Sequence, residues 1–222
     1  WGLSSSFRPG GEMMPKVKQE AEAAIKLDPN HAEALALRGM ALISHDRDVE
    51  AANRDFRKAL AFAPSSPVVL QTFAFALMTQ GKAQESVKLL KQAIAVDPLS
   101  PLPWTFLGIT QQTAGNFKAA QEAGQRVVSL EPDFYFGHLI LGTTALHQGR
   151  RQEALKELDL AAASGSNYAL AFKGKALGLS GRTEEARAVL AFLQSPKARE
   201  NGYVSPLHLA LVHLGLGQRK EA

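Results

Sequence analysis

Histidine is the first residue type to consider, because its imidazole ring titrates near neutral pH and ligates metals. A zinc-type site needs several converging ligands, often a pair four residues apart on one helix face. His208 and His213 lie five residues apart, and His31 and His45 are expected near helix ends. The sequence therefore predicts surface or interface roles for the histidines and no metal site.

Paired carboxylates are the second candidates, because two neighbouring carboxyl groups perform acid–base catalysis in many enzymes. The pairs Glu184 with Glu185 and Glu50 with Asp55 are expected on the outer side of helices, as solvated charge. No glycine-rich segment combines a lysine with the strand–loop–helix setting of a phosphate site, and no strand precedes Ser164-Gly165-Ser166, as it would in a nucleophile elbow. We therefore predict no catalytic residue, no cofactor and no enzymatic activity in this chain.

The composition excludes several kinds of site and partner. The 222 residues include no cysteine, which excludes disulfides and thiolate metal sites and suits a reducing compartment. The formal net charge is +4, and the basic residues form scattered pairs such as Arg150-Arg151, without the basic stripe of a nucleic-acid-binding protein. No apolar run approaches the roughly 18 residues of a membrane span. We expect a cytoplasmic chain without a nucleic-acid partner, and the start at Trp1 predicts a fragment of a longer protein.

A period of about 34 residues organises the elements that would position any site. Prolines that end amphipathic runs follow one another after 35, 34 and 34 residues, at Pro29, Pro64, Pro98 and Pro132. Glycines recur between these prolines, at Gly81, Gly115, Gly149, Gly181 and Gly217. A glycine there supplies the positive φ that closes the first of two helices. Each unit is therefore predicted to be a helix, a tight turn and a second helix.

The helices are expected over 13–27, 32–45, 49–62, 67–80, 83–96, 101–114, 117–130, 134–148, 151–163, 168–180, 183–193 and 204–216. Residues 195–202 are expected to form a longer linker before the last helix. The eighth and twentieth positions of the units share a small side chain. They are Gly39, Ala74, Gly108, Gly142 and Gly174, and Ala52, Ser86, Ala120, Ala154 and Ala186. A larger side chain at a close helix crossing costs about 1–3 kcal/mol through overpacking, so we expect these positions to face each other there.

This pattern resembles the tetratricopeptide repeat (TPR) family. The fourth unit shows it most fully, with Trp104-x2-Leu107-Gly108 followed by Gly115, Ala120 and Pro132. The resemblance implies an all-α fold, a right-handed superhelix of antiparallel helix pairs, in a single domain over residues 1–222. Five nearly complete repeats are expected over 32–64, 67–98, 101–132, 135–166 and 167–200, with half-repeats over 1–29 and 203–222.

A narrower likeness concerns two phrases, residues 93–101 and 203–211. They resemble the C-terminal TPR regions of bacterial multidomain signalling and regulatory proteins, in which a winged-helix, serine/threonine kinase or adenylate cyclase domain comes first. The likeness implies that this module serves a larger bacterial protein, whose other domains would carry any catalytic or DNA-binding activity.

In the TPR family, recurring positions of each first helix point into a concave groove that holds a peptide or helix of another protein. The resemblance places this groove at Gln71, Phe75, Met78, Thr105, Ile109, Gln112, Leu139, Thr143, Ala171 and Lys175. Some TPR domains grip an acidic C-terminal tail with Lys, Asn and Arg at such positions, and Gln71, Phe75, Thr105 and Ile109 do not form that clamp. For each apolar residue the alternative is packing between adjacent repeats, as part of the core.

We therefore expect a protein–protein interaction scaffold that binds a peptide or helix of a partner in its concave groove. The alternative is a structural role, in which uncapped repeat ends let a multidomain regulator self-associate. The helix expected over 204–216 motivates this alternative, because Leu207, Leu211 and Leu214 form an apolar face on it.

Overall fold

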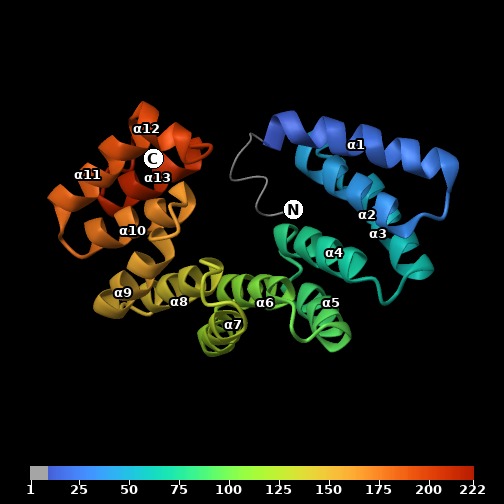
Figure 1. Ribbon diagram of the computed structural model, residues 1–222, viewed down its shortest axis with the longest axis horizontal. Coiled ribbons are helices and arrows are strands. Elements are labelled where there is room, and N and C mark those ends of the chain that lie inside the picture. Colours follow the sequence, from blue (N-terminus) through green and yellow to red (C-terminus); the bar gives the residue numbers. More distant parts are fainter. Residues whose placement is uncertain (1–9) are drawn as a thin grey trace. The chain divides into compact units, whose positions relative to one another are not determined.

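The computed structural model describes residues 10–222, with side chains from Met13 onward, and these residues form helices joined by turns, without strands. The all-α fold is therefore confirmed. Residues 1–9 of the half-repeat expected over 1–29 lie outside the described residues. The chain divides into two compact units, an N-terminal unit of Gly10–Asn116 and a C-terminal unit that includes Phe117–Ala222 (Figure 1). The repeat boundaries, and the single domain expected over 1–222, stay predictions.

The N-terminal unit is a stack of helix pairs, drawn from blue to green in Figure 1. Its elements are α1 (Gly10–Leu27), α2 (Ala32–Ala41), the π-helical turn η2 (Leu42–Asp46), α3 (Val49–Phe62), α4 (Pro67–Thr79), α5 (Ala83–Val96) and α6 (Pro101–Thr113). Helix α2 packs against α3, and α4 packs against α5. The first helices of successive repeats also contact one another, α2 with α4 and α4 with α6.

The C-terminal unit is likewise built of paired helices and is drawn from yellow-green to red in Figure 1. Its elements are α7 (Phe117–Leu130), α8 (Phe136–His147), α9 (Arg151–Ala162), α10 (Asn167–Leu179), α11 (Thr183–Gln194), α12 (Pro196–Glu200) and α13 (Pro206–Gly215). Helices α8 and α9 form one pair and α10 and α11 the next, while α13 packs against both α10 and α11. The helices expected from the sequence agree with these bounds to within a few residues, apart from two places described below.

The turns between paired helices use glycine as expected. Gly81, Gly115, Gly149, Gly181 and Gly217 all have φ between 74° and 79°, in the left-handed region where glycine carries no steric penalty. One of the 34-residue repeats lacks this glycine: position 47, which lies 34 residues before Gly81, holds arginine. There the helix expected through residue 45 widens into η2, and Arg47 adopts a φ of 61°. The π-helical turn η2 therefore occurs in the repeat whose turn has Arg47, and not glycine, at positive φ.

The prediction of a plain linker over 195–202 is wrong, because this segment contains the short helix α12. Two tertiary features hold it. Ala198 is fully buried, and the amide Nδ2 of Asn167 donates to the carbonyl oxygens of Ala198, at 2.7 Å, and of Gly202, at 3.2 Å. Five helical residues are too few to show a hydrophobic period, so the sequence pattern could not reveal this helix.

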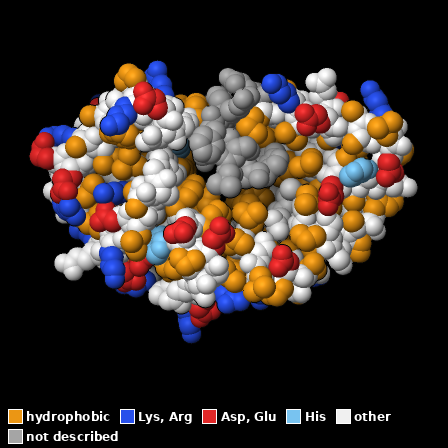
Figure 2. Space-filling model, in the orientation of Figure 1, with side chains coloured by type: hydrophobic (Ala, Val, Ile, Leu, Met, Phe, Trp, Pro, Cys, Tyr) orange, Lys and Arg blue, Asp and Glu red, His pale blue; other side chains and the backbone are white. Residues whose placement is uncertain are grey.

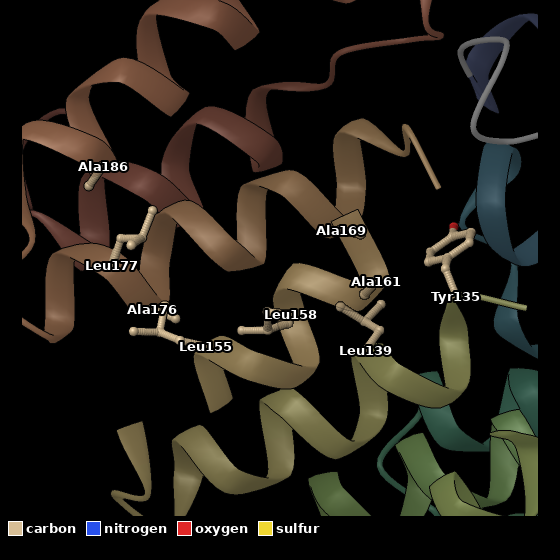
Figure 3. Packing of buried hydrophobic residues seen from close by; sticks show 9 residues of the cluster. All are labelled: Tyr135, Leu139, Leu155, Leu158, Ala161, Ala169, Ala176, Leu177 and Ala186. Atoms are coloured by element: carbon tan, nitrogen blue, oxygen red, sulfur yellow. The ribbon is translucent and has the colours of Figure 1, made fainter. Parts of the chain in front are cut away.

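Small residues allow the paired helices to approach closely. Ala52, Ser86, Ala120, Ala154 and Ala186 are all fully buried. A Cβ added to Gly39 would meet the Phe56 ring at 3.0 Å, and one added to Gly142 would meet Leu158 Cγ at 2.6 Å. Around such crossings α8, α9, α10 and α11 share one apolar cluster, which includes Leu158 and Leu177 (Figure 3). The first helix of a pair therefore gives up side-chain volume so that the bulky residues of the second helix can pack.

Asp55 corrects another expectation. The sequence suggested solvated charge, but this residue is only 5% exposed. Arg38 on α2 donates to its carboxylate from Nε, at 2.7 Å, and from Nη2, at 2.8 Å. The Asp55 carboxylate raises the pKa of Arg38 through these hydrogen bonds. A two-pronged ion pair therefore joins α2 to α3, and it allows one carboxylate to lie in the helix interface.

Candidate partner-binding surface

Half-buried side chains of α4 and α6 form the accessible part of the expected groove in the N-terminal unit. Gln71, Phe75 and Met78 lie at i, i+4 and i+7 and therefore share one face of α4. Ile109 and Gln112 lie three residues apart on α6 and are half-buried as well. We call these five residues the α4–α6 surface. It is neither core nor fully solvated, which suits a surface that a partner could cover.

Aromatic packing fixes the spacing of the two helices beneath this surface. The rings of Phe75 on α4 and Phe106 on α6 lie 5.6 Å apart between centroids, tilted by 58°, which is a favourable arrangement for aromatic side chains. At the start of α4, Ser66 caps the helix by accepting a hydrogen bond from the Val69 backbone, and Pro67 occupies the first helical position. Local residues therefore set where α4 begins, and the contact with Phe106 on α6 holds the Phe75 ring.

Four of the expected groove residues are buried. Thr105, Leu139, Thr143 and Ala171 are all at most 6% exposed. Leu139 belongs to the apolar cluster of the C-terminal unit, where its side chain points among the packed helices (Figure 3). The Thr143 hydroxyl donates to the carbonyl oxygen of Leu139 at 2.7 Å, within its own helix. These four residues therefore pack within the helix stack, which was the alternative to groove lining. They offer a partner little accessible surface.

The C-terminal unit has a separate small cavity between α8 and α10, which we call the α8–α10 pocket. Its volume is about 100 Å³, and its lining is Thr143, Leu146, His147, Phe172, Lys175 and Leu179. Thr143 and Lys175 were expected in the groove, Leu146 lies at one of the same family positions, and His147, Phe172 and Leu179 were absent from the expected set. Helical spacing was the signal for these three, because residue 147 shares a face with 143, and residues 172 and 179 share a face with 175.

The electrostatics of this pocket are set by one lysine. Among its lining residues Lys175 carries the only full charge at neutral pH. Partial burial, and then the Lys175 charge, lower the pKa of His147, so its imidazole is neutral at pH 7. The His147 ring stacks near Phe117, with 5.8 Å between ring centroids. The pocket therefore combines apolar walls, a neutral imidazole and one ammonium group.

Two other histidines, His138 and His208, form hydrogen bonds within the chain. His138 Nδ1 lies 2.8 Å from a carboxylate oxygen of Glu157. His208 is buried, and its Nδ1 accepts a hydrogen bond of 3.4 Å from the Ser205 backbone at the start of α13, while burial lowers its pKa. Among the side chains of residues 13–222, no three His, Asp or Glu residues cluster as metal ligands would. In the same part of the chain, every helix is too short or too polar to cross a membrane.

Surface charges of opposite sign are mixed. At the left rim of Figure 2, which belongs to the C-terminal unit, acidic and basic side chains alternate, with apolar ones between them. At the start of α11, whose N-cap is Arg182, the pairs Arg182–Glu185 and Arg187–Glu184 have N–O distances of 2.6 Å and 2.7 Å. Exposed pairs of this kind contribute little to stability. These pairs do neutralise the local charge, whereas a cation without an acidic neighbour keeps its charge available to a ligand.

Comparison with solved structures supports the fold. PilW, described as a widely conserved type IV pilus biogenesis factor, is 21% identical with a TM-score of 0.70, and the match covers 86% of this chain and 91% of PilW. PilF of Pseudomonas aeruginosa is 20% identical with a TM-score of 0.65, over 95% of this chain and 89% of PilF. YrrB, described as a TPR protein with an unusual peptide-binding site, is 19% identical with a TM-score of 0.53, over 87% of this chain and 96% of YrrB. At these identities the likeness concerns the fold alone.

Comparison with protein families gives the stronger result. A family model described as tetratricopeptide repeat matches residues 18–67 and 107–169. A second model with the same description matches residues 167–191. The first model alone spans just over half of the chain, and its matches lie in both structural units. The expected resemblance is confirmed, and the chain belongs to the tetratricopeptide repeat family.

Proposed function

We propose that this chain is a protein–protein interaction scaffold and that its α4–α6 surface binds a peptide or helix of another protein. Proteins of the tetratricopeptide repeat family are generally interaction scaffolds. The observation that carries the proposal here is the half-buried apolar set Phe75, Met78 and Ile109 on two first helices in contact. Apolar side chains that remain accessible on neighbouring helices often mark the place where a partner docks.

Two further observations support this reading. YrrB, which shares the fold, is described as having a peptide-binding site, so the fold can hold a peptide. The phrases at residues 93–101 and 203–211 resemble repeat regions of bacterial multidomain regulators, which supports a role as the binding module of such a protein. We propose binding rather than catalysis as the activity of this chain.

The test is loss of a partner when charge is placed on the α4–α6 surface. The chain is immobilised, partners are captured from a lysate of its source organism, and the protein retained is compared with that on a Phe75→Glu/Ile109→Glu variant. We expect the variant to bind the captured partner at least about tenfold more weakly, because two carboxylates would be desolvated against an apolar ligand. Affinity is measured by titrating the purified partner.

The control carries the same added charge elsewhere. Gln84→Glu/Gln92→Glu alters exposed residues of α5 and should bind like the parent. Because Phe75 and Ile109 are half-buried, helicity and melting temperature must match the parent, and Phe75→Ala/Ile109→Ala provides a second variant without charge. Equal retention by the parent and by both surface variants would show that the α4–α6 surface is not the binding site.

Self-association is the second candidate function, and the exposure of α13 favours it. Leu207 is 57% exposed and Leu214 is 44% exposed on this helix, whereas Leu211 is buried. Two exposed leucines on one helix give a second copy an apolar contact. We expect the chain to dimerise at high concentration and the Leu207→Glu/Leu214→Glu variant to remain monomeric in light scattering. A parent chain that stays monomeric over the whole concentration range contradicts this candidate.

A further inference from the structure

The α8–α10 pocket differs chemically from the α4–α6 surface. Three apolar side chains, Leu146, Phe172 and Leu179, line it together with Lys175 and His147. Ligand sites for small molecules usually enclose about 300–1,000 Å³, so a cavity of about 100 Å³ is too small for a cofactor. A water molecule takes roughly 30 Å³, and the pocket therefore has room for the end of one side chain.

The state of Lys175 shows which side chain fits. Lys173, two residues earlier on α10, is neutralised by Asp159, with 2.8 Å between Nζ and the carboxylate. For Lys175, no carboxylate of residues 13–222 lies within 4 Å of the ammonium group. The residue is nevertheless half-buried, in a pocket with apolar walls. An ammonium group that no carboxylate neutralises attracts an anion more strongly than a paired one such as Lys173 does.

We propose that the α8–α10 pocket binds the carboxylate of an acidic residue in a partner peptide, with Lys175 as its counter-charge. The apolar walls formed by Leu146, Phe172 and Leu179 contact the aliphatic stem of that same acidic side chain. This inference rests on the proposed function, because it assumes that the first helices meet a peptide, and it defines the chemistry of that peptide. One ammonium group and no asparagine or arginine line the pocket, so it recognises a side chain within a peptide rather than the two carboxylates of a chain end.

Two peptides that differ in one charge test the proposal on the whole chain. The probes are acetyl-Leu-Glu-Leu-amide and acetyl-Leu-Gln-Leu-amide, and the readout is the methyl NMR shifts of Leu146 and Leu179 during titration. We expect the glutamate peptide to move these signals and to bind about fivefold more tightly than the glutamine peptide, the order of one partly screened ion pair. The difference should shrink as ionic strength rises.

Variants of two neighbouring lysines assign the effect. In Lys175→Gln the preference for glutamate should disappear, and in Lys173→Gln it should remain. Lys175→Met serves if Lys175→Gln is poorly folded. Equal binding of both peptides, no shift at Leu146 and Leu179 with either, or a preference that survives in Lys175→Gln overturns the proposal. None of these results depends on Phe75 or Ile109, so failure here is distinct from failure of the α4–α6 surface.

Discussion

Replacing Phe56 with alanine is expected to lower the free energy of unfolding by about 3–5 kcal/mol. Phe56 on α3 is fully buried, and its ring stacks on Phe73 of α4, with 5.0 Å between centroids and 3° between planes. The ring also lies against Gly39 of α2, where an added Cβ would come within 3.0 Å. Alanine would leave a cavity that three helices border. Urea unfolding followed by circular dichroism measures the loss.

The same helix supplies the control. Phe62, at the end of α3, is 50% exposed, and we expect Phe62→Ala to cost less than about 1 kcal/mol, because little apolar area is lost from the interior. The contact with Gly39 allows a second check. Gly39→Ala alone should destabilise by crowding the Phe56 ring, but in the Phe56→Ala background the added methyl group should be tolerated. Similar losses for Phe56→Ala and Phe62→Ala would contradict the packing described here.

Replacing Gly215 with alanine is expected to cost about 1–3 kcal/mol, the range for overpacking a close contact. Gly215 is buried at the end of α13, and an added Cβ would lie 2.5 Å from the carbonyl oxygen of Lys175 and 2.6 Å from its Cα. These are backbone atoms, so no side-chain rotation relieves the clash. Gly178 on α10 faces the same crossing, with 2.4 Å from its added Cβ to the Gly215 carbonyl carbon. Helices α10 and α13 therefore meet backbone against backbone.

Amide hydrogen exchange shows where the loss occurs. We expect Gly215→Ala to speed exchange in α13 while leaving the N-terminal unit protected, since the clash separates α13 from α10. Leu214→Ala is the matched control, because it alters the preceding residue of α13, whose side chain is 44% exposed. Unchanged unfolding and unchanged exchange in Gly215→Ala would mean that the two helices do not approach as closely as described.

The candidate site shows how far repeat position alone can predict accessibility. Ten groove residues were expected, and six of them remain half-buried and accessible: Gln71, Phe75, Met78, Ile109, Gln112 and Lys175. Thr105 and Leu139 occupy related positions on their own helices and are buried. A position rule states which face of a helix a residue occupies, while accessibility depends on the side chains that neighbouring helices present to that face. The sequence predicted only part of the lining of the α8–α10 pocket for the same reason, because the lining residues come from two helices.

The sequence by itself determined the helix pairs, their turns and their family, because each is encoded locally. A period of 3.6 residues defines a helix, a glycine at positive φ defines the turn, and their recurrence about every 34 residues defines the stack. Only the tertiary structure decided that Asp55 is buried beside Arg38 and that Asn167 holds α12. It also decided that, among the side chains of residues 13–222, Lys173 has a carboxylate partner and Lys175 has none. Each of these depends on residues from another helix, and the distance between two helices is set by packing across the whole unit, which no local pattern contains.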